Sequence, residues 1–131
     1  MEAWVAGPPL VILNGRAVTG LLPPEPAAGW IALRRGWRPG DRLEVTLPMR
    51  LAFAPAPDHP AVQAVTYGPV VLSGVYPADP GPLTPPLQLT SLQRAAGPRL
   101  AFDADSGRQP VRLIPVSRAA HQYYAVYWQA R

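Results

Sequence analysis

The sequence contains no cysteine and no lysine, and only two histidines and two phenylalanines. Without cysteine, disulfides, thiolate zinc sites, iron–sulfur clusters and a cysteine nucleophile are all excluded. No apolar run reaches the roughly 18 residues of a transmembrane helix, and the basic-then-apolar pattern of a signal peptide does not occur. We therefore expect a cytoplasmic chain without a membrane partner.

All 12 basic residues are Arg, and the formal net charge is +4. A GC-rich genome explains this usage as readily as phosphate binding does. The charge is therefore weak evidence about partners.

Proline and glycine are abundant, with 19 and 11 copies in 131 residues. A proline inside a helix costs about 3 kcal/mol, so few helices fit. Apolar residues instead alternate with polar ones, which is typical of half-buried strands. The clearest alternation predicts a core face made of Leu43, Val45, Leu47, Met49, Leu51 and Phe53. Pro48 interrupts this run, so we expect an edge or a bend there.

Seven further strands are predicted at residues 10–13, 30–35, 62–67, 70–76, 99–102, 111–116 and 123–128, with one short helix within 88–96. Asn14-Gly15 is a strong hairpin signal, because a type I′ turn needs positive φ at both positions. We predict an all-β, antiparallel sandwich of immunoglobulin-like or jelly-roll-like type, with part of a second one. The expected domains are 1–76 and 87–131, joined by a proline-rich connector at 77–86.

Candidate catalytic groups are few. His59 and His121 are far apart in the sequence, and Asp103 and Asp105 resemble a calcium loop only faintly, because a third ligand and the closing Glu are missing. No acid pair, nucleophile elbow, phosphate loop or dinucleotide fingerprint stands out. We therefore expect no catalytic residue, metal site or cofactor.

Two aromatic segments are candidates for binding. Residues 34–38 mix arginine with Trp37, which suits base or sugar stacking but also a packed turn with solvated arginines. Residues 123–128 form an aromatic strand with Tyr124, Val126 and Trp128 on one face. Such a strand serves as core or as a sugar platform.

Four motifs in order resemble the post-catalytic region of glycoside hydrolase family 127, the β-L-arabinofuranosidase family. They are Ala3-Trp4 with Asn14-Gly15, residues 29–34 with 37–49, residues 67–74, and residues 110–115 with 121–128. The resemblance covers nearly the whole chain.

The resemblance implies β-sandwich domains that, in the family, follow an (α/α)6 barrel with a zinc-bound cysteine nucleophile. None of those catalytic residues has a counterpart here, so we expect a fragment, a split-gene product or a stand-alone remnant that is not an enzyme by itself. Trp4, Trp30 and Trp37 would be packing anchors, Gly40 and Asp41 a turn, and Gly68-Pro69 a bend after Tyr67. His121, Tyr124 and Trp128 would belong to the closing strands.

The leading hypothesis is thus a non-catalytic accessory module that binds a catalytic barrel chain or itself. A carbohydrate-binding module, with an oligosaccharide as partner, is the alternative. An Arg-rich nucleic-acid binder is a third hypothesis, which one basic cluster supports less well.

Overall fold

The computed structural model describes residues 6–19, 33–120 and 122–131, and the chain forms two compact units, Met1–Arg50 and Leu51–Arg131. Both are built from β-strands joined by turns, with two short 3₁₀ helices in the second unit. The predicted all-β, sandwich-like fold is confirmed. Among the described residues no helix is long and apolar enough to cross a membrane.

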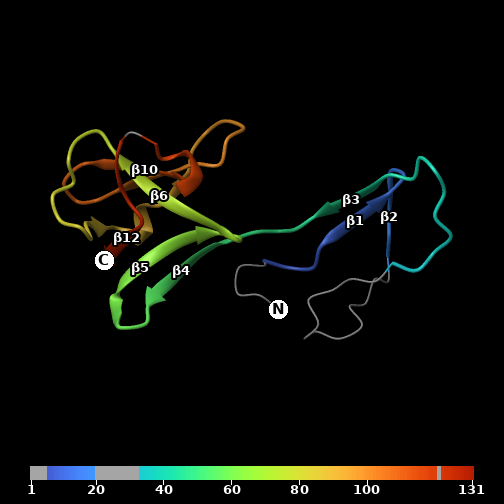
Figure 1. The fold of residues 1–131 in the computed structure, drawn as a ribbon, viewed down its shortest axis with the longest axis horizontal. Helices are drawn as coiled ribbons and strands as arrows, with labels where there is room; N and C mark the ends of the chain where they lie inside the picture. The colour runs from blue at the N-terminus through green and yellow to red at the C-terminus, as the bar shows by residue number, and fades with distance from the viewer. Residues whose placement is uncertain (1–5, 20–32, 121) are drawn as a thin grey trace. The chain divides into compact units, whose positions relative to one another are not determined.

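The first unit holds a three-stranded antiparallel sheet (Figure 1). Its strands are β1 (Leu10–Leu13), β2 (Arg16–Ala17) and β3 (Leu43–Thr46), in the order β2-β1-β3. Asn14 and Gly15 connect β1 to β2 with φ values of 50° and 77°. The predicted hairpin is confirmed, and both central residues have the positive φ of a type I′ turn.

The second unit is one nine-stranded sheet that curls around its own core. Its central order is β7-β12-β5-β6-β10-β9-β8, with β4 beside β5 and β11 beside β6. Figure 1 labels β4, β5, β6, β10 and β12 of this sheet. The strands are β4 (Leu51–Ala56), β5 (His59–Tyr67), β6 (Val70–Tyr76), β7 (Pro86–Leu87), β8 (Gln93–Arg94), β9 (Phe102–Asp105), β10 (Pro110–Pro115), β11 (Tyr123–Ala125) and β12 (Tyr127–Ala130). The helices are η1 (Leu89–Ser91) and η2 (Val116–Arg118). All pairs are antiparallel except β7 with β12.

The proline-rich segment 77–86 does not separate two domains, contrary to our expectation. Strands on either side of it pair directly, β6 with β10 and β11, and β5 with β12. The chain divides at Arg50 instead. The physical reason is that about 45 residues after the segment cannot bury an adequate core alone, so they complete their sheet with the β5–β6 hairpin.

The core of the second unit lies on the concave side of this sheet. Nine buried side chains form it: Val65, Leu72, Tyr76, Leu87, Phe102, Val111, Leu113, Ala125 and Trp128. Trp128 is 1% exposed, and its indole N–H donates to the Tyr76 hydroxyl at 2.9 Å. This bond satisfies the one polar group that the ring would otherwise bury unpaired.

The predicted core face over 43–53 is wrong for four of its six side chains. Leu43, Val45 and Leu47 are 43%, 52% and 42% exposed, and Phe53 is 40% exposed. Leu51, in contrast, is half-buried and packs against the core of the second unit. The run crosses from one compact unit to the other between Arg50 and Leu51, so it cannot be the face of one continuous strand. Pro48 lies between β3 and β4, as expected, and its carbonyl accepts the backbone N–H of Ala6 at 2.9 Å.

Other predicted elements need smaller corrections. The strand expected at 99–102 begins at Phe102, because residues 95–101 form the loop between β8 and β9. The helix expected within 88–96 is only η1, since β8 then pairs with β9. Of the strand expected at 30–35, residues 33–35 are irregular and 30–32 lie outside the described residues.

The aromatic strand 123–128 also differs from expectation. It is broken at Val126 into β11 and β12, which pair with different partners. Tyr124 therefore does not share a face with Trp128: it is 53% exposed, whereas Trp128 is buried. A period of two holds only while a strand is continuous.

Gly74 allows the close approach of Trp128 to β6. A Cβ atom at Gly74 would lie 2.7 Å from Val111 Cγ2 and 2.9 Å from Trp128 Cζ2. We expect Gly74→Ala to lower the free energy of unfolding by about 1–3 kcal/mol through overpacking, measured by urea denaturation followed by tryptophan fluorescence. The control is Gly36→Ala, where no neighbour lies within 4 Å. Equal stability of the two variants would contradict this account of the core.

Candidate binding surfaces

A hydrogen-bonded network ties two turns of the first unit together. The Asn14 side-chain amide donates to Asp41 Oδ1 at 2.8 Å, and the Arg42 backbone N–H donates to Asn14 Oδ1 at 2.8 Å. Asp41 Oδ2 accepts the Arg38 backbone N–H at 2.9 Å. Gly40, with a φ of 90°, supplies the left-handed residue that this second turn needs. The predicted turn at Gly40-Asp41 thus lies against the predicted Asn14-Gly15 hairpin.

Asp41 is the centre of this network. The hydrogen bond from Asn14, then that from the Arg38 backbone, with a smaller contribution from the Arg35 charge, lowers the pKa of Asp41 below its ordinary value of 3.8. The Arg35 Nη2 atom lies 3.4 Å from Asp41 Oδ2. The carboxylate is therefore held as an anion by donors from three places in the chain.

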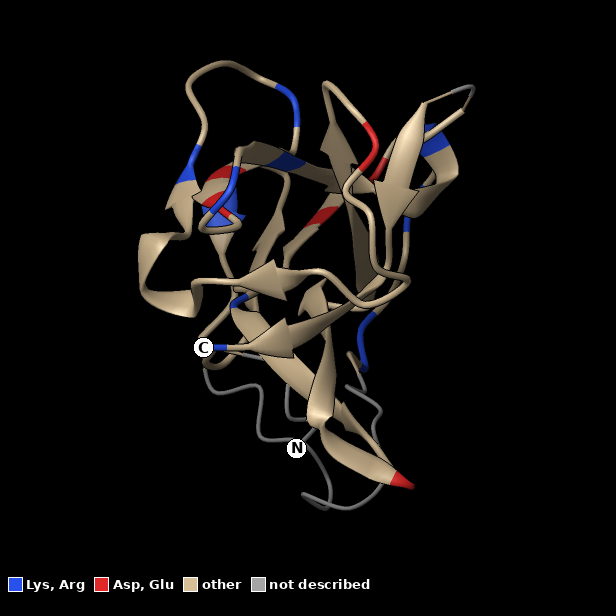
Figure 2. Cartoon of the chain, turned by 90° about the vertical axis from the view of Figure 1, so that its left-hand side faces the viewer, with Lys and Arg blue, Asp and Glu red and all other residues tan. Residues whose placement is uncertain are grey.

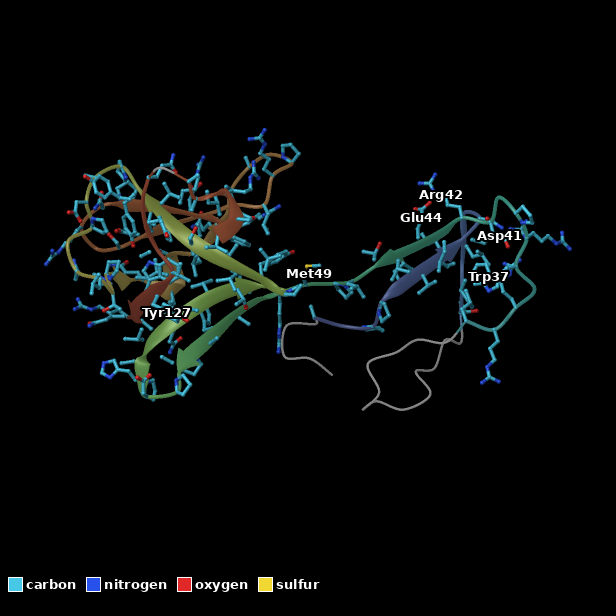
Figure 3. The ribbon with its side chains drawn as sticks, viewed as in Figure 1. Trp37, Asp41, Arg42, Glu44, Met49 and Tyr127 are labelled. Carbon is cyan, nitrogen blue, oxygen red and sulfur yellow. The ribbon has the colours of Figure 1, made fainter. Side chains whose placement is uncertain are left out.

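Trp37 lies beside this network and is 51% exposed (Figure 3). The Arg35 guanidinium carbon is 5.4 Å from the centroid of its ring. Trp37 is therefore not the buried packing anchor that we expected. Because Arg35 covers one ring face and also contacts Asp41, this cluster offers less stacking surface to a base than the sequence suggested.

An apolar strip runs along β3 and just beyond it, and we define it as Leu43, Val45 and Leu47. Leu43 and Val45 alternate with Glu44 and Thr46, so they lie on one face of β3, and Leu47 follows directly after the strand. Val45 pairs with Val11 of β1, which is 4% exposed, and yet Val45 itself is 52% exposed. On this face of the sheet, Val11 of β1 is therefore covered, whereas the neighbouring apolar side chains of the strip are exposed.

A second surface is a shallow groove of about 630 Å³ on the outer side of the second unit, which we call the Tyr127 groove. Tyr127 lies opposite Ala64, which lies opposite Ala54, across β12, β5 and β4. The ring is 50% exposed beside these small side chains (Figure 3). The remaining lining is Pro55, Ala56, Pro57, Asp58, His59, Val62, Leu83 and Thr84.

The groove combines a flat aromatic ring with polar groups at its rim. Tyr127 and Leu83 are apolar, and Asp58 and His59 come from the turn and strand start between β4 and β5. Such a mixture suits a ligand with one apolar face and several hydroxyls. Tyr127 lies in the aromatic segment 123–128 but was not among the predicted site residues. Its place next to Trp128 on one strand, and so on the opposite face, is the signal that could have found it.

The other expected site residues lie against the core, in a turn or outside the described residues. Tyr67 packs on Phe102 with ring centroids 5.5 Å apart. Gly68 and Pro69 form the turn between β5 and β6, and the Gly68 φ of 58° is the reason for glycine there. Trp4, Trp30 and His121 lie outside the described residues.

The two aspartates of the faint calcium loop have other partners. Asp103 accepts two bonds from Arg112, at 2.8 and 3.2 Å, and Asp105 Oδ1 accepts the Gly107 N–H at 2.7 Å. Over residues 6–19, 33–120 and 122–131, no three His, Cys, Asp or Glu side chains are grouped as metal ligands. Here Asp105 organises the hairpin turn between β9 and β10.

A scan of protein-family models finds no match to this chain, and a search of curated proteins finds none either. The resemblance to glycoside hydrolase family 127 therefore stays a prediction.

The Asp41 network predicts a pH dependence of the first unit. Because the folded pKa is lowered, the stabilisation is present above pH about 4 and is lost as the pH falls through the folded pKa. We expect Asp41→Asn to melt at a lower temperature than wild type at pH 7, with the difference shrinking toward pH 2.5, as measured by circular dichroism. Glu44→Gln is the control, since that carboxylate is half exposed and pairs with Arg42 at 3.0 Å, outside the Asp41 network. A pH-independent difference would count against the network.

Proposed function

We propose that the chain is a non-catalytic accessory β-module of a glycoside hydrolase family 127-like protein, and that it binds a separately encoded (α/α)6 barrel chain. Two observations support this proposal. The ordered motifs resemble the sandwich region that follows the barrel in that family. The apolar strip on β3 is exposed in the isolated chain.

The exposed strip is the observation that carries the proposal. Its alternation is that of a buried face, yet each of its three side chains keeps more than two-fifths of its surface exposed. Covering a fully exposed Val or Leu side chain stabilises by about 1.5–3 kcal/mol, so covering the strip would contribute several kcal/mol to association. A contiguous apolar face of this kind is typical of an interaction site.

The mechanism is structural burial. The module would cover part of the barrel surface, and the barrel would cover Leu43, Val45 and Leu47 in turn. The Asp41 network stabilises the adjoining turns, which limits the entropy that β3 would lose on docking. The alternative partner is a second copy of the chain, which would cover the same strip.

A charge in the strip should prevent docking. We expect Val45→Arg to weaken binding to the barrel chain about tenfold or more, because the guanidinium would be buried without a partner. Biolayer interferometry with immobilised barrel chain measures this affinity. The matched control is Thr46→Arg, which adds the same charge to the opposite face of β3.

Light scattering distinguishes the two possible partners of the strip, the barrel chain and a second copy of this chain. A 1:1 complex that Val45→Arg disrupts and Thr46→Arg preserves is the expected result. The chain alone could instead form a dimer that Val45→Arg dissociates. That result would show that a second copy of the chain, and not the barrel, covers the strip. Equal binding of both variants would show that the strip is not the interface.

Carbohydrate binding is a second candidate function, and the Tyr127 groove favours it. The half-exposed ring beside Ala54 and Ala64 offers a flat surface for the apolar face of a sugar. Asp58 and His59 at the rim supply hydrogen-bonding groups for hydroxyls.

Removing the ring should remove this binding. We expect arabinose-containing oligosaccharides to bind the wild-type chain and to bind Tyr127→Ala about tenfold or more weakly, as measured by calorimetry. The control is Tyr123→Ala, which removes an equally exposed tyrosine outside the groove. Absence of binding to wild type at millimolar saccharide, or equal loss in both variants, would reject the groove as a sugar site.

A further inference from the structure

A second pocket, of about 380 Å³, lies in the second unit between the β8–β9 loop and η2, and we call it the arginine pocket. Three guanidinium-bearing residues line it, Arg99 from the loop, Arg112 from β10 and Arg118 from η2. Ala95, Leu100 and Ile114 add apolar surface to the lining. Neither proposed function above uses this pocket.

The sheet register explains how these residues come together. On β10, Val111 and Leu113 are buried in the core, so Arg112 and Ile114 lie on the opposite, outer face. Arg112 lies opposite Asp103 of β9, and two hydrogen bonds fix its guanidinium there. Asp103 also raises the pKa of Arg112, mainly through the hydrogen bond and to a smaller extent through its charge. The outer face of β10 thus forms one side of the pocket, and Asp103 holds the guanidinium of Arg112 in place on it.

The balance of charge in the pocket is positive. Asp103 is already engaged with Arg112. No ion pair or side-chain hydrogen bond ties Arg99 or Arg118 within the described part of the chain. Arginine keeps its charge at every physiological pH. Figure 2 shows that basic residues of the chain occur on loops as well as on strands. Here the β8–β9 loop and η2 bring Arg99 and Arg118 to one strand face.

The apolar part of the lining limits the kind of anion. Leu100, Ile114 and Ala95 face a volume that lies in the range of small-molecule sites. A bare ion would leave this surface in water, whereas a carbon skeleton would cover it. Arginine forks match the two oxygens of a carboxylate or a phosphate.

We propose that the arginine pocket binds a small organic anion of monosaccharide size, through a carboxylate or a phosphate held by Arg99 and Arg118. The sugar-sized body of the ligand lies over Ile114 and Leu100. This site is separate from the apolar strip and from the Tyr127 groove, so it stands whether or not the chain docks on a barrel.

Calorimetry on the full chain at constant ionic strength tests the proposal with four probes: glucuronate, glucose 6-phosphate, glucose and inorganic phosphate. We expect one of the two organic anions to bind about tenfold or more tightly than glucose and inorganic phosphate. Which one it is identifies the anionic group. Arg99→Gln and Arg118→Gln should each weaken that binding at least about fivefold, since each removes a charged donor.

The matched control is Arg108→Gln, which removes a basic residue from the β9–β10 turn, outside the pocket. Unchanged affinity in this variant is the expected result. The proposal is overturned if both organic anions bind no better than glucose, or if inorganic phosphate binds as tightly as they do. The proposal is also overturned if Arg108→Gln weakens anion binding as much as the pocket variants do. The binding would then depend on the overall charge of the chain and not on the pocket. The comparison of probes uses wild type alone, so it does not depend on how the variants fold.

Discussion

The second unit depends on the burial of Trp128 against Gly74. The indole ring reaches β6 because position 74 has no side chain, and its N–H is satisfied by the Tyr76 hydroxyl at 2.9 Å. Burial raises the pKa of that hydroxyl above its ordinary value of 10.0, so it stays a neutral donor and acceptor in the core. With Trp128 in place, β12 pairs with both β5 and β7, and the chain end joins the sheet begun by residues 51–76. The proline-rich segment is therefore an internal connection within one compact unit.

The same constraint places the candidate binding surfaces. With Trp128 facing inward, Tyr127 must face outward on β12, and its small neighbours Ala64 and Ala54 leave the ring accessible. On β10, burial of Leu113 likewise turns Arg112 and Ile114 to the outside. In the first unit, hydrogen bonds around Asp41 connect two turns of the described residues. The apolar side chains of Leu43 and Val45 on β3 are 43% and 52% exposed.

Local patterns predicted the strands and turns whose causes are local. The Asn14-Gly15 hairpin and the strand 70–76 follow from backbone preference and alternation, and both are present as predicted. The burial of the 43–53 face was mispredicted, because alternation reports that one face is apolar but not what covers it. The domain boundary failed for a related reason: the long-range pairing of β5 with β12 leaves no local signal in the sequence. The contact of Asn14 with Asp41 and the convergence of Arg99, Arg112 and Arg118 are also tertiary, so residue spacing could not give them.

Hydrogen–deuterium exchange of the chain, alone and mixed with the barrel chain, tests the central claim most directly, since it reads every strand without any substitution. The account predicts slower exchange on mixing in residues 10–13 and 43–47, which carry β1 and the apolar strip, with β9 and β10 unchanged. A complex that leaves residues 43–47 unprotected, or no change anywhere in the chain, would contradict it.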